Sequence, residues 1–219
     1  MKIDYVDLIL IHTPRNVMGV QNYDTFEIWK GLEEAKQLGL TRSIGVSNFN
    51  STDMARILAN STTLPAVNQI ETNPTFANQE LVAYCQSKSI VVMGYSSFGF
   101  LVPRPFNDLS LPPSFEDPTL VGMAEKYGVT VSQVVQRYLV DRYIIPIAGS
   151  LNKEHIQSNI NIYNFSLCHE DVLIINQFDR NVKVYLIDYE GLFNYMHLAF
   201  LKLIEFVECN NLRQYELKS

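Results

Sequence analysis

The sequence predicts an α/β protein built on a five-stranded parallel sheet with helices outside it. Segments typical of strands alternate with segments of helical periodicity five times along the 219 residues, and this alternation implies parallel strands joined by right-handed crossovers. Five of the six residues over 6–11 are apolar, as expected for a parallel strand covered on both faces. Polar residues follow each of the five strands, and ligand sites in such folds lie at carboxyl strand ends.

The first strand and its helix are the clearest unit. The strand over residues 6–11 leads to His12, and Pro14 stops it. Apolar side chains recur at helical spacing over residues 24–38, and Gly39 supplies a C-terminal cap for this helix.

The second and third units follow the same order. A strand over residues 43–47 precedes a helix that either Asn50 or Ser51 can cap. A strand over residues 66–71 then leads to a helix over residues 78–88. We therefore expect two further parallel strands beside the first.

The remaining units are separated by an irregular loop. A strand over residues 90–95 is followed by residues 98–118, which hold five of the nine prolines and favour irregular structure. The elements expected after this loop are helices over residues 119–127 and 132–141, a strand over residues 144–147, a helix over residues 152–159 and a last helix that begins after residue 167.

Composition excludes several classes of protein. The formal net charge of −6 argues against nucleic acid as a partner, because phosphate binding needs a basic surface. We expect no membrane span, because no apolar run is long enough to cross a bilayer. The three cysteines show no metal or disulfide spacing, so with no signal peptide expected we predict a cytoplasmic protein. Residues 1–196 should form one domain and residues 197–219 a helical, then polar, tail.

The polar residues at the strand ends suggest one binding site. Serine, asparagine and glutamine side chains both donate and accept hydrogen bonds and so suit a neutral amide ligand. A tyrosine offers a flat face for an aromatic ring, and a helix N-terminus favours a phosphate. The residues concerned are His12, Ser47, Asn48, Gln69, Tyr95, Ser96 and Ser150.

Structural roles are the alternatives for single members of this set. His12 could be a strand-end histidine bonded to backbone, and the pair Ser47-Asn48 could cap the following helix. Gln69 could make a simple strand-end hydrogen bond. The ordered set favours the binding site over these separate explanations.

Four ordered motifs resemble the aldo-keto reductase superfamily of NADP-dependent carbonyl reductases, in particular its aldose-reductase-like members. The resemblance runs from residue 3 to about residue 195. The motifs are DYVDLILIH over residues 4–12, GVSNFN over 45–50, NQIE over 68–71 and GYS over 94–96.

The resemblance implies roles for the residues at the first four strand ends. His12 matches the catalytic histidine that orients the substrate carbonyl and assists proton donation. Ser47, Asn48 and Gln69 match residues that bond the nicotinamide carboxamide, and Tyr95 matches the tyrosine that stacks on the nicotinamide ring.

The rest of the cofactor site is implied less completely. Ser96 matches the start of the segment over the pyrophosphate, and Ser150 and Asn159 match part of the site for the adenosine end. The implied cofactor is NADP, but Gly149 and His155 replace the usual lysine and arginine that pair with the 2′-phosphate. We therefore expect that NAD is also possible.

The resemblance implies a partial TIM (β/α)₈ barrel, because the chain matches about the last five of the family's eight βα units. The family's catalytic aspartate, tyrosine and lysine belong to the first three units. The expected function is NADP(H)-dependent reduction of aldehydes or ketones, with a small carbonyl compound as substrate and a monomer if full-length. The alternatives are a catalytically inactive truncated reductase or an interaction protein that uses the C-terminal tail.

Overall fold

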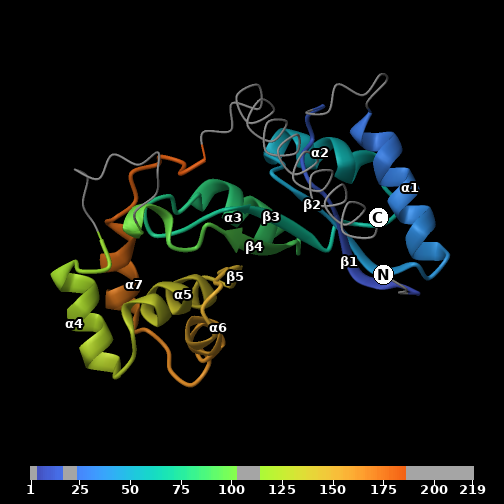
Figure 1. The fold of residues 1–219 in the computed structure, drawn as a ribbon. Coiled ribbons are helices and arrows are strands. Elements are labelled where there is room, and N and C mark those ends of the chain that lie inside the picture. The colour runs from blue at the N-terminus through green and yellow to red at the C-terminus, as the bar shows by residue number, and fades with distance from the viewer. Residues whose placement is uncertain (1–3, 17–23, 103–113, 186–219) are drawn as a thin grey trace, which may run out of the picture. The chain divides into compact units, whose positions relative to one another are not determined.

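The computed structural model describes residues 4–16, 24–102 and 114–185, and it confirms the predicted parallel sheet. All strand pairs are parallel, and the strands lie in the order in which they occur along the chain (Figure 1). Within the described residues, the first and last strands are the edges of the sheet. The strands are β1 (Val6–Ile11), β2 (Thr41–Ser47), β3 (Val67–Glu71), β4 (Val91–Tyr95) and β5 (Ile144–Pro146).

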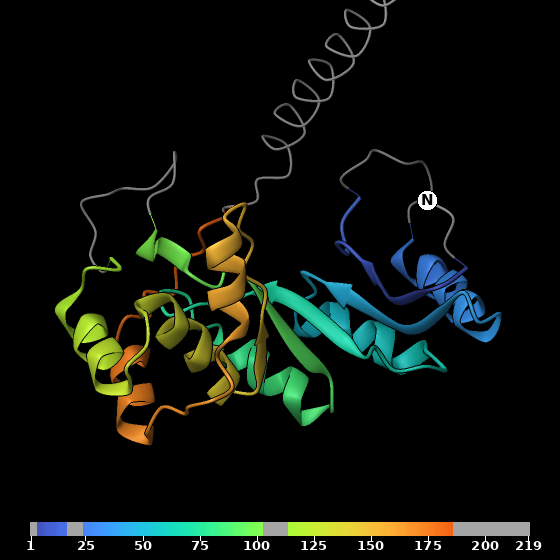
Figure 2. The same ribbon diagram turned by 60° about the horizontal axis from the view of Figure 1, so that its bottom comes forward.

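The helices follow the predicted order within one compact unit that includes the described residues 4–15, 24–102 and 114–184. Figures 1 and 2 show α1 beside β1 and β2, and α5 beside β5. The predicted tail over residues 197–219 and its boundary at residue 196 lie outside the described residues. The helices are α1 (Thr25–Gln37), α2 (Ser51–Asn60), α3 (Gln79–Ser87), α4 (Pro118–Tyr127), α5 (Val131–Asp141), α6 (Lys153–Ile160) and α7 (His169–Asn176), with a short 3₁₀ helix, η1 (Gly99–Leu101), after β4.

Local capping sets the helix ends close to where the sequence places them. Asn50, not Ser51, caps α2: its side chain accepts from the backbone N–H of Asp53, whose carboxylate accepts from the backbone N–H of Asn50. Gly39, with φ +74°, follows α1 in the left-handed conformation that glycine adopts without steric cost.

The strand register brings the carboxyl ends to one edge of the sheet. Ser47 pairs with Gln69 across β2 and β3, and Glu71 pairs with Tyr95 across β3 and β4. Strand β2 begins at Thr41, two residues before its predicted start, because pairing with β1 extends that far. A regular register of this kind places the polar residues that follow each strand beside one another.

Apolar side chains of the sheet and helices form one core. Ile44 and Val46 of β2, Trp29 of α1 and Leu139 of α5 are fully buried in it. Gly45 allows β3 to approach β2, since a Cβ at this position would lie 2.7 Å from the carbonyl oxygen of Val67. The core therefore holds the strand ends in a fixed arrangement.

Candidate functional site

The ends of β2 and β3 are joined directly by hydrogen bonds. The Ser47 hydroxyl donates to the carbonyl oxygen of Gln69 over 2.8 Å, and the Asn48 backbone N–H donates to the same oxygen over 2.9 Å. Ser47 is buried. Its side chain therefore serves to hold the two strand ends together.

Asn48 connects three strand ends. Its Nδ2 donates to the backbone carbonyl oxygen of His12, after β1, over 3.0 Å, and its Oδ1 accepts from the hydroxyl of Tyr95, at the end of β4, over 2.9 Å. Nδ2 also lies 3.2 Å from Oγ of Ser47. Asn48 has φ +63°, a left-handed conformation that asparagine tolerates better than most residues. We call His12, Ser47, Asn48, Gln69 and Tyr95 the strand-end cluster.

One of the structural alternatives, capping of α2 by Ser47 and Asn48, is wrong. Asn50 caps α2, so Ser47 and Asn48 are not its N-terminal cap. The imidazole of His12 is exposed, and the carboxamide of Gln69 is half-buried. Neither side chain has a hydrogen-bond partner among the residues that the structure describes. Both side chains can therefore bind a ligand at the carboxyl ends of their strands.

The residues after β4 form a tight turn that ties β4 to the chain beyond β5. Ser96 has φ +52°, and its carbonyl oxygen accepts from the backbone N–H of Gly99 over 2.7 Å. The buried hydroxyl of Ser97 lies 3.0 Å from the carbonyl oxygens of both Gly94 and Ile147. The sequence offered no signal for this role of Ser97.

Ser150 and Asn159, assigned to the adenosine end, are not part of the strand-end cluster. Oγ of Ser150 lies 3.5 Å from Nδ1 of His155 and accepts from the backbone N–H of Asn152 over 3.1 Å. Oδ1 of Asn159 accepts from Nε2 of Gln136 in α5 over 2.8 Å. None of the hydrogen bonds found within the described ranges connects these two residues to the five residues of the cluster.

A second cluster, far from the strand ends in the chain, brings together a tyrosine, a lysine and an aspartate. The hydroxyl of Tyr127 and Nζ of Lys126 both donate to Oδ2 of Asp171, over 2.5 Å and 2.7 Å. The backbone N–H of Cys168 donates to the hydroxyl of Tyr127 over 2.8 Å. These contacts join the end of α4 to the start of α7.

The protonation properties of this second cluster fit a structural role. Burial, together with the hydrogen bond to Asp171, raises the pKa of Tyr127. The hydrogen bond to Asp171 also raises the pKa of Lys126. Burial tends to raise the pKa of Asp171, but hydrogen bonds from Lys126 and Tyr127 outweigh it and lower that pKa. Tyr127 is therefore a weaker acid than an ordinary tyrosine.

Glu71 is a buried carboxylate at the end of β3 that sequence reasoning missed. It is 2% exposed, and its Oε1 accepts from the backbone N–H of Val184 over 2.6 Å. The backbone N–H of Arg180 donates to the carbonyl oxygen of Thr75 over 3.0 Å. The segment after α7 is thereby held against the β3–α3 connection. Its partner lies 113 residues away, so local sequence could not indicate the contact.

Two negative findings apply to the described parts of the chain. The ranges 4–16, 24–102 and 114–185 contain no group of three or more acidic, histidine or cysteine residues arranged to hold a metal ion. The helices within these ranges are also too short or too polar to cross a membrane.

Comparison with known proteins finds relatives that all belong to one family. The model of the "Aldo/keto reductase family" matches residues 1–180. Aldo-keto reductase AKR2E4 of Bombyx mori is 49% identical over 185 residues, which are 83% of this chain and 60% of that protein. Human aldo-keto reductase family 1 member C1 is 35% identical over 205 residues, which are 86% of this chain and 63% of that protein.

Solved structures give the same result for the fold. The crystal structure of Bombyx mori AKR2E4 in complex with NADP has a TM-score of 0.80 and 48% sequence identity, covering 84% of this chain and 61% of that chain. The structure of AKR2E5 complexed with NADPH has a TM-score of 0.79 at 40% identity, covering 84% and 57%. The five-stranded sheet is therefore a partial version of the fold of these proteins, the partial TIM barrel that the sequence predicts.

Proposed function

This chain belongs to the aldo/keto reductase family, and from that premise we propose that the strand-end cluster binds the nicotinamide end of NADP(H). The corresponding reaction of the whole protein is the reduction of small aldehydes or ketones to alcohols. The observation that supports this proposal is the hydrogen-bonded cluster itself. Asn48 joins three strand ends, and the side chains of His12 and Gln69 stand beside it with no partner among the described residues.

The chemistry of the cluster suits a carboxamide ligand. A nicotinamide carboxamide has one carbonyl acceptor and one NH₂ donor group, and the half-buried carboxamide of Gln69 complements both. Both ends of the Asn48 amide already make hydrogen bonds, because Nδ2 donates to the backbone carbonyl of His12 and Oδ1 accepts from the hydroxyl of Tyr95. We expect the bond between Tyr95 and Asn48 to open when the cofactor binds, which would free Oδ1 of Asn48 for the ligand and the Tyr95 ring for stacking.

We propose that His12 acts on the substrate. Bound NADPH supplies the hydride for carbonyl reduction. The exposed imidazole of His12 follows β1, and its backbone carbonyl is held by Asn48. A ring N–H at this position would hold the carbonyl oxygen of the substrate while the hydride is delivered.

Carbonyl reduction also needs an acid that donates a proton to the substrate oxygen. A positioned acid contributes about 10²–10⁴-fold to such a step. Among the described residues, the tyrosine and lysine that share an aspartate are Tyr127 and Lys126, and they join α4 to α7. We propose that this 219-residue chain binds nucleotide without reducing carbonyls above background by itself.

The adenosine end of the site supports little discrimination between NADP and NAD. Gly149 offers no side chain, and His155 lies in the exposed first turn of α6. Lys153 is the nearest lysine in the sequence that could partly compensate. That the full-length protein is a monomer in the cytoplasm stays a prediction, as does an interaction role for the tail.

Gln69→Ala tests the proposed cofactor site. Quenching of protein fluorescence by NADPH would measure affinity for the 219-residue chain. Loss of the Gln69 carboxamide should weaken binding about tenfold, equivalent to about 1.4 kcal/mol. Gln37→Ala is the matched control, because Gln37 is exposed at the end of α1. Equal affinities of the two variants would contradict the assignment.

A further inference from the structure

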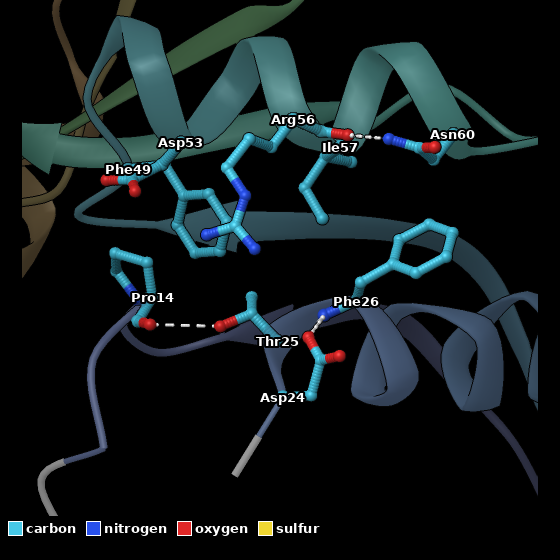
Figure 3. A pocket seen from close by; sticks show the side chains of 9 residues that line it. All are labelled: Pro14, Asp24, Thr25, Phe26, Phe49, Asp53, Arg56, Ile57 and Asn60. Carbon is cyan, nitrogen blue, oxygen red and sulfur yellow. Dashed lines mark hydrogen bonds between the residues drawn. The ribbon is translucent and has the colours of Figure 1, made fainter.

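A cavity of about 170 Å³ lies between α1 and α2 and contains none of the strand-end cluster residues (Figure 3). Phe49 and Ile57, both almost fully buried, and the half-buried Phe26 form its apolar part. The polar lining includes Asp24, Thr25, Asp53, Arg56 and Asn60. The cavity is therefore an open hollow in which apolar side chains lie beside polar and charged ones.

Arg56 extends from α2 toward α1 over this cavity, and its guanidinium has no partner among the described residues (Figure 3). The groups on α2 that could pair with it are directed elsewhere. Asp53, three residues before it, accepts from the backbone N–H of Asn50 over 3.3 Å. Asn60, four residues after it, donates from Nδ2 to the backbone carbonyl oxygen of Arg56 over 2.8 Å.

The carboxylates at the rim have structural partners of their own. Oδ1 of Asp24 accepts from the backbone N–H of Phe26 over 2.9 Å as the N-cap of α1. Asp53 lies in the first turn of α2. The positive ends of the two helices partly offset both negative charges. The guanidinium of Arg56 is thus the charge at this rim that lacks a protein partner within the described ranges.

We propose that this cavity binds a small carboxylate that carries a single apolar ring. A guanidinium recognises a carboxylate through two parallel N–H···O bonds, so the carboxylate would bind Arg56. An enclosed apolar cavity of about 150 Å³ accommodates benzene, and the present hollow, which is open to solvent and partly polar, has a volume that admits a ring of the same size. The ring would lie against Phe26 and Phe49 in an offset or edge-to-face arrangement.

Phenylacetate is the probe that tests this site, titrated into the full 219-residue chain and followed by calorimetry. We expect saturable binding to the unmodified chain and at least a tenfold loss of affinity in Arg56→Gln. The neutral analogue 2-phenylethanol should bind at least tenfold more weakly than phenylacetate, and equally to both proteins, because it lacks the group that Arg56 binds.

Arg42→Gln is the matched control. Arg42 is an exposed arginine that pairs with Asp7 over 3.1 Å and lies over the ring of Tyr5, and it does not line the cavity. We expect its phenylacetate affinity to be unchanged. Thermal melting of both variants would verify that they are folded, and NADPH affinity should be unchanged in Arg56→Gln. If Arg56→Gln lost NADPH affinity but kept its phenylacetate affinity, the result would concern the strand-end cluster and would contradict the assignment of Arg56 to this cavity.

Three results would overturn the proposal. One is the absence of saturable phenylacetate binding to the unmodified chain. Another is a phenylacetate affinity that falls equally, or does not fall, in Arg56→Gln and Arg42→Gln. The third is tighter binding of phenethylamine than of phenylacetate, which would assign the cavity to a cation held by Asp24 and Asp53.

Discussion

The ends of β1–β4 and the region of β5 and α6 differ in how firmly their proposed site residues are held. At the ends of β1–β4, Asn48 alone makes side-chain hydrogen bonds to His12 and Tyr95, which belong to two other strand ends. Around α6, Ser150 has only short-range contacts, and Asn159 faces α5. No residue of α6 is buried.

This difference teaches that one half of the proposed site is preorganised and the other is not. Side chains already fixed by packing and hydrogen bonds lose little conformational freedom when a ligand binds. Ser47, Asn48 and Tyr95 of the strand-end cluster meet this condition, whereas the exposed α6 region does not. We therefore expect the nicotinamide end to account for most of the recognition of a dinucleotide.

The largest expected effect concerns turnover. The 219-residue chain should show no carbonyl-dependent oxidation of NADPH above background, because a positioned acid contributes about 10²–10⁴-fold and the described tyrosine and lysine that share an aspartate join α4 to α7 instead of assisting His12. Absorbance of NADPH with an aromatic aldehyde measures this rate. Rapid reduction that His12→Ala abolishes would show that the preorganised half of the site suffices for catalysis.

Asn48→Ala and Asn159→Ala compare the two regions directly. Asn48→Ala removes bonds to three strand ends and leaves the hydroxyl of Tyr95 without this acceptor, so NADPH affinity should fall about thirtyfold, or about 2 kcal/mol. Asn159→Ala should change affinity by less than about threefold, since its side chain contacts α5. Fluorescence titration of both variants measures the difference. A loss of NADPH affinity in Asn159→Ala as large as that in Asn48→Ala would contradict the proposed difference between the two regions.

Asp171→Asn tests whether the cluster between α4 and α7 serves stability and not binding. The pKa of Asp171 is lowered in the folded chain, so its contribution is present above the ordinary aspartate pKa of about 3.9 and is lost as the pH falls through the lowered value. The substitution should cost about 1–3 kcal/mol near pH 7 and progressively less below pH 4. Urea unfolding at several pH values measures this, and NADPH affinity should not change. A cost that persists undiminished at low pH would exclude the carboxylate as its source.

The last prediction concerns the preference of the chain between the two cofactors. NADP should bind less than about a hundredfold more tightly than NAD, a difference below about 2.7 kcal/mol, because Gly149 and His155 provide no permanent positive charge for the 2′-phosphate. Parallel titrations of both cofactors measure the ratio. Replacement of Gly149 by lysine should raise the preference for NADP. A preference above a hundredfold in the unmodified chain would mean that Lys153 or another cation already binds the phosphate.

The sequence by itself determined the order and direction of the strands and the identity of the strand-end residues. Apolar periodicity and capping are local properties, so the bounds of β1 could be predicted from neighbouring residues, and the start of α2 could be narrowed to a cap at Asn50 or Ser51. The position of His12 and Gln69 at the sheet edge followed from the same pattern. The parallel arrangement followed from the alternation of strands and helices.

The tertiary structure alone decided which partners these side chains have. Asn48 bonds to Tyr95, 47 residues away, and Glu71 to Val184, 113 residues away. It also turned Asn159 toward α5 and left Arg56 over a cavity between two helices. A polar side chain has several possible partners of similar chemistry along the chain. Only the packing of the elements decides which of them lies within about 3 Å of it, where a hydrogen bond forms.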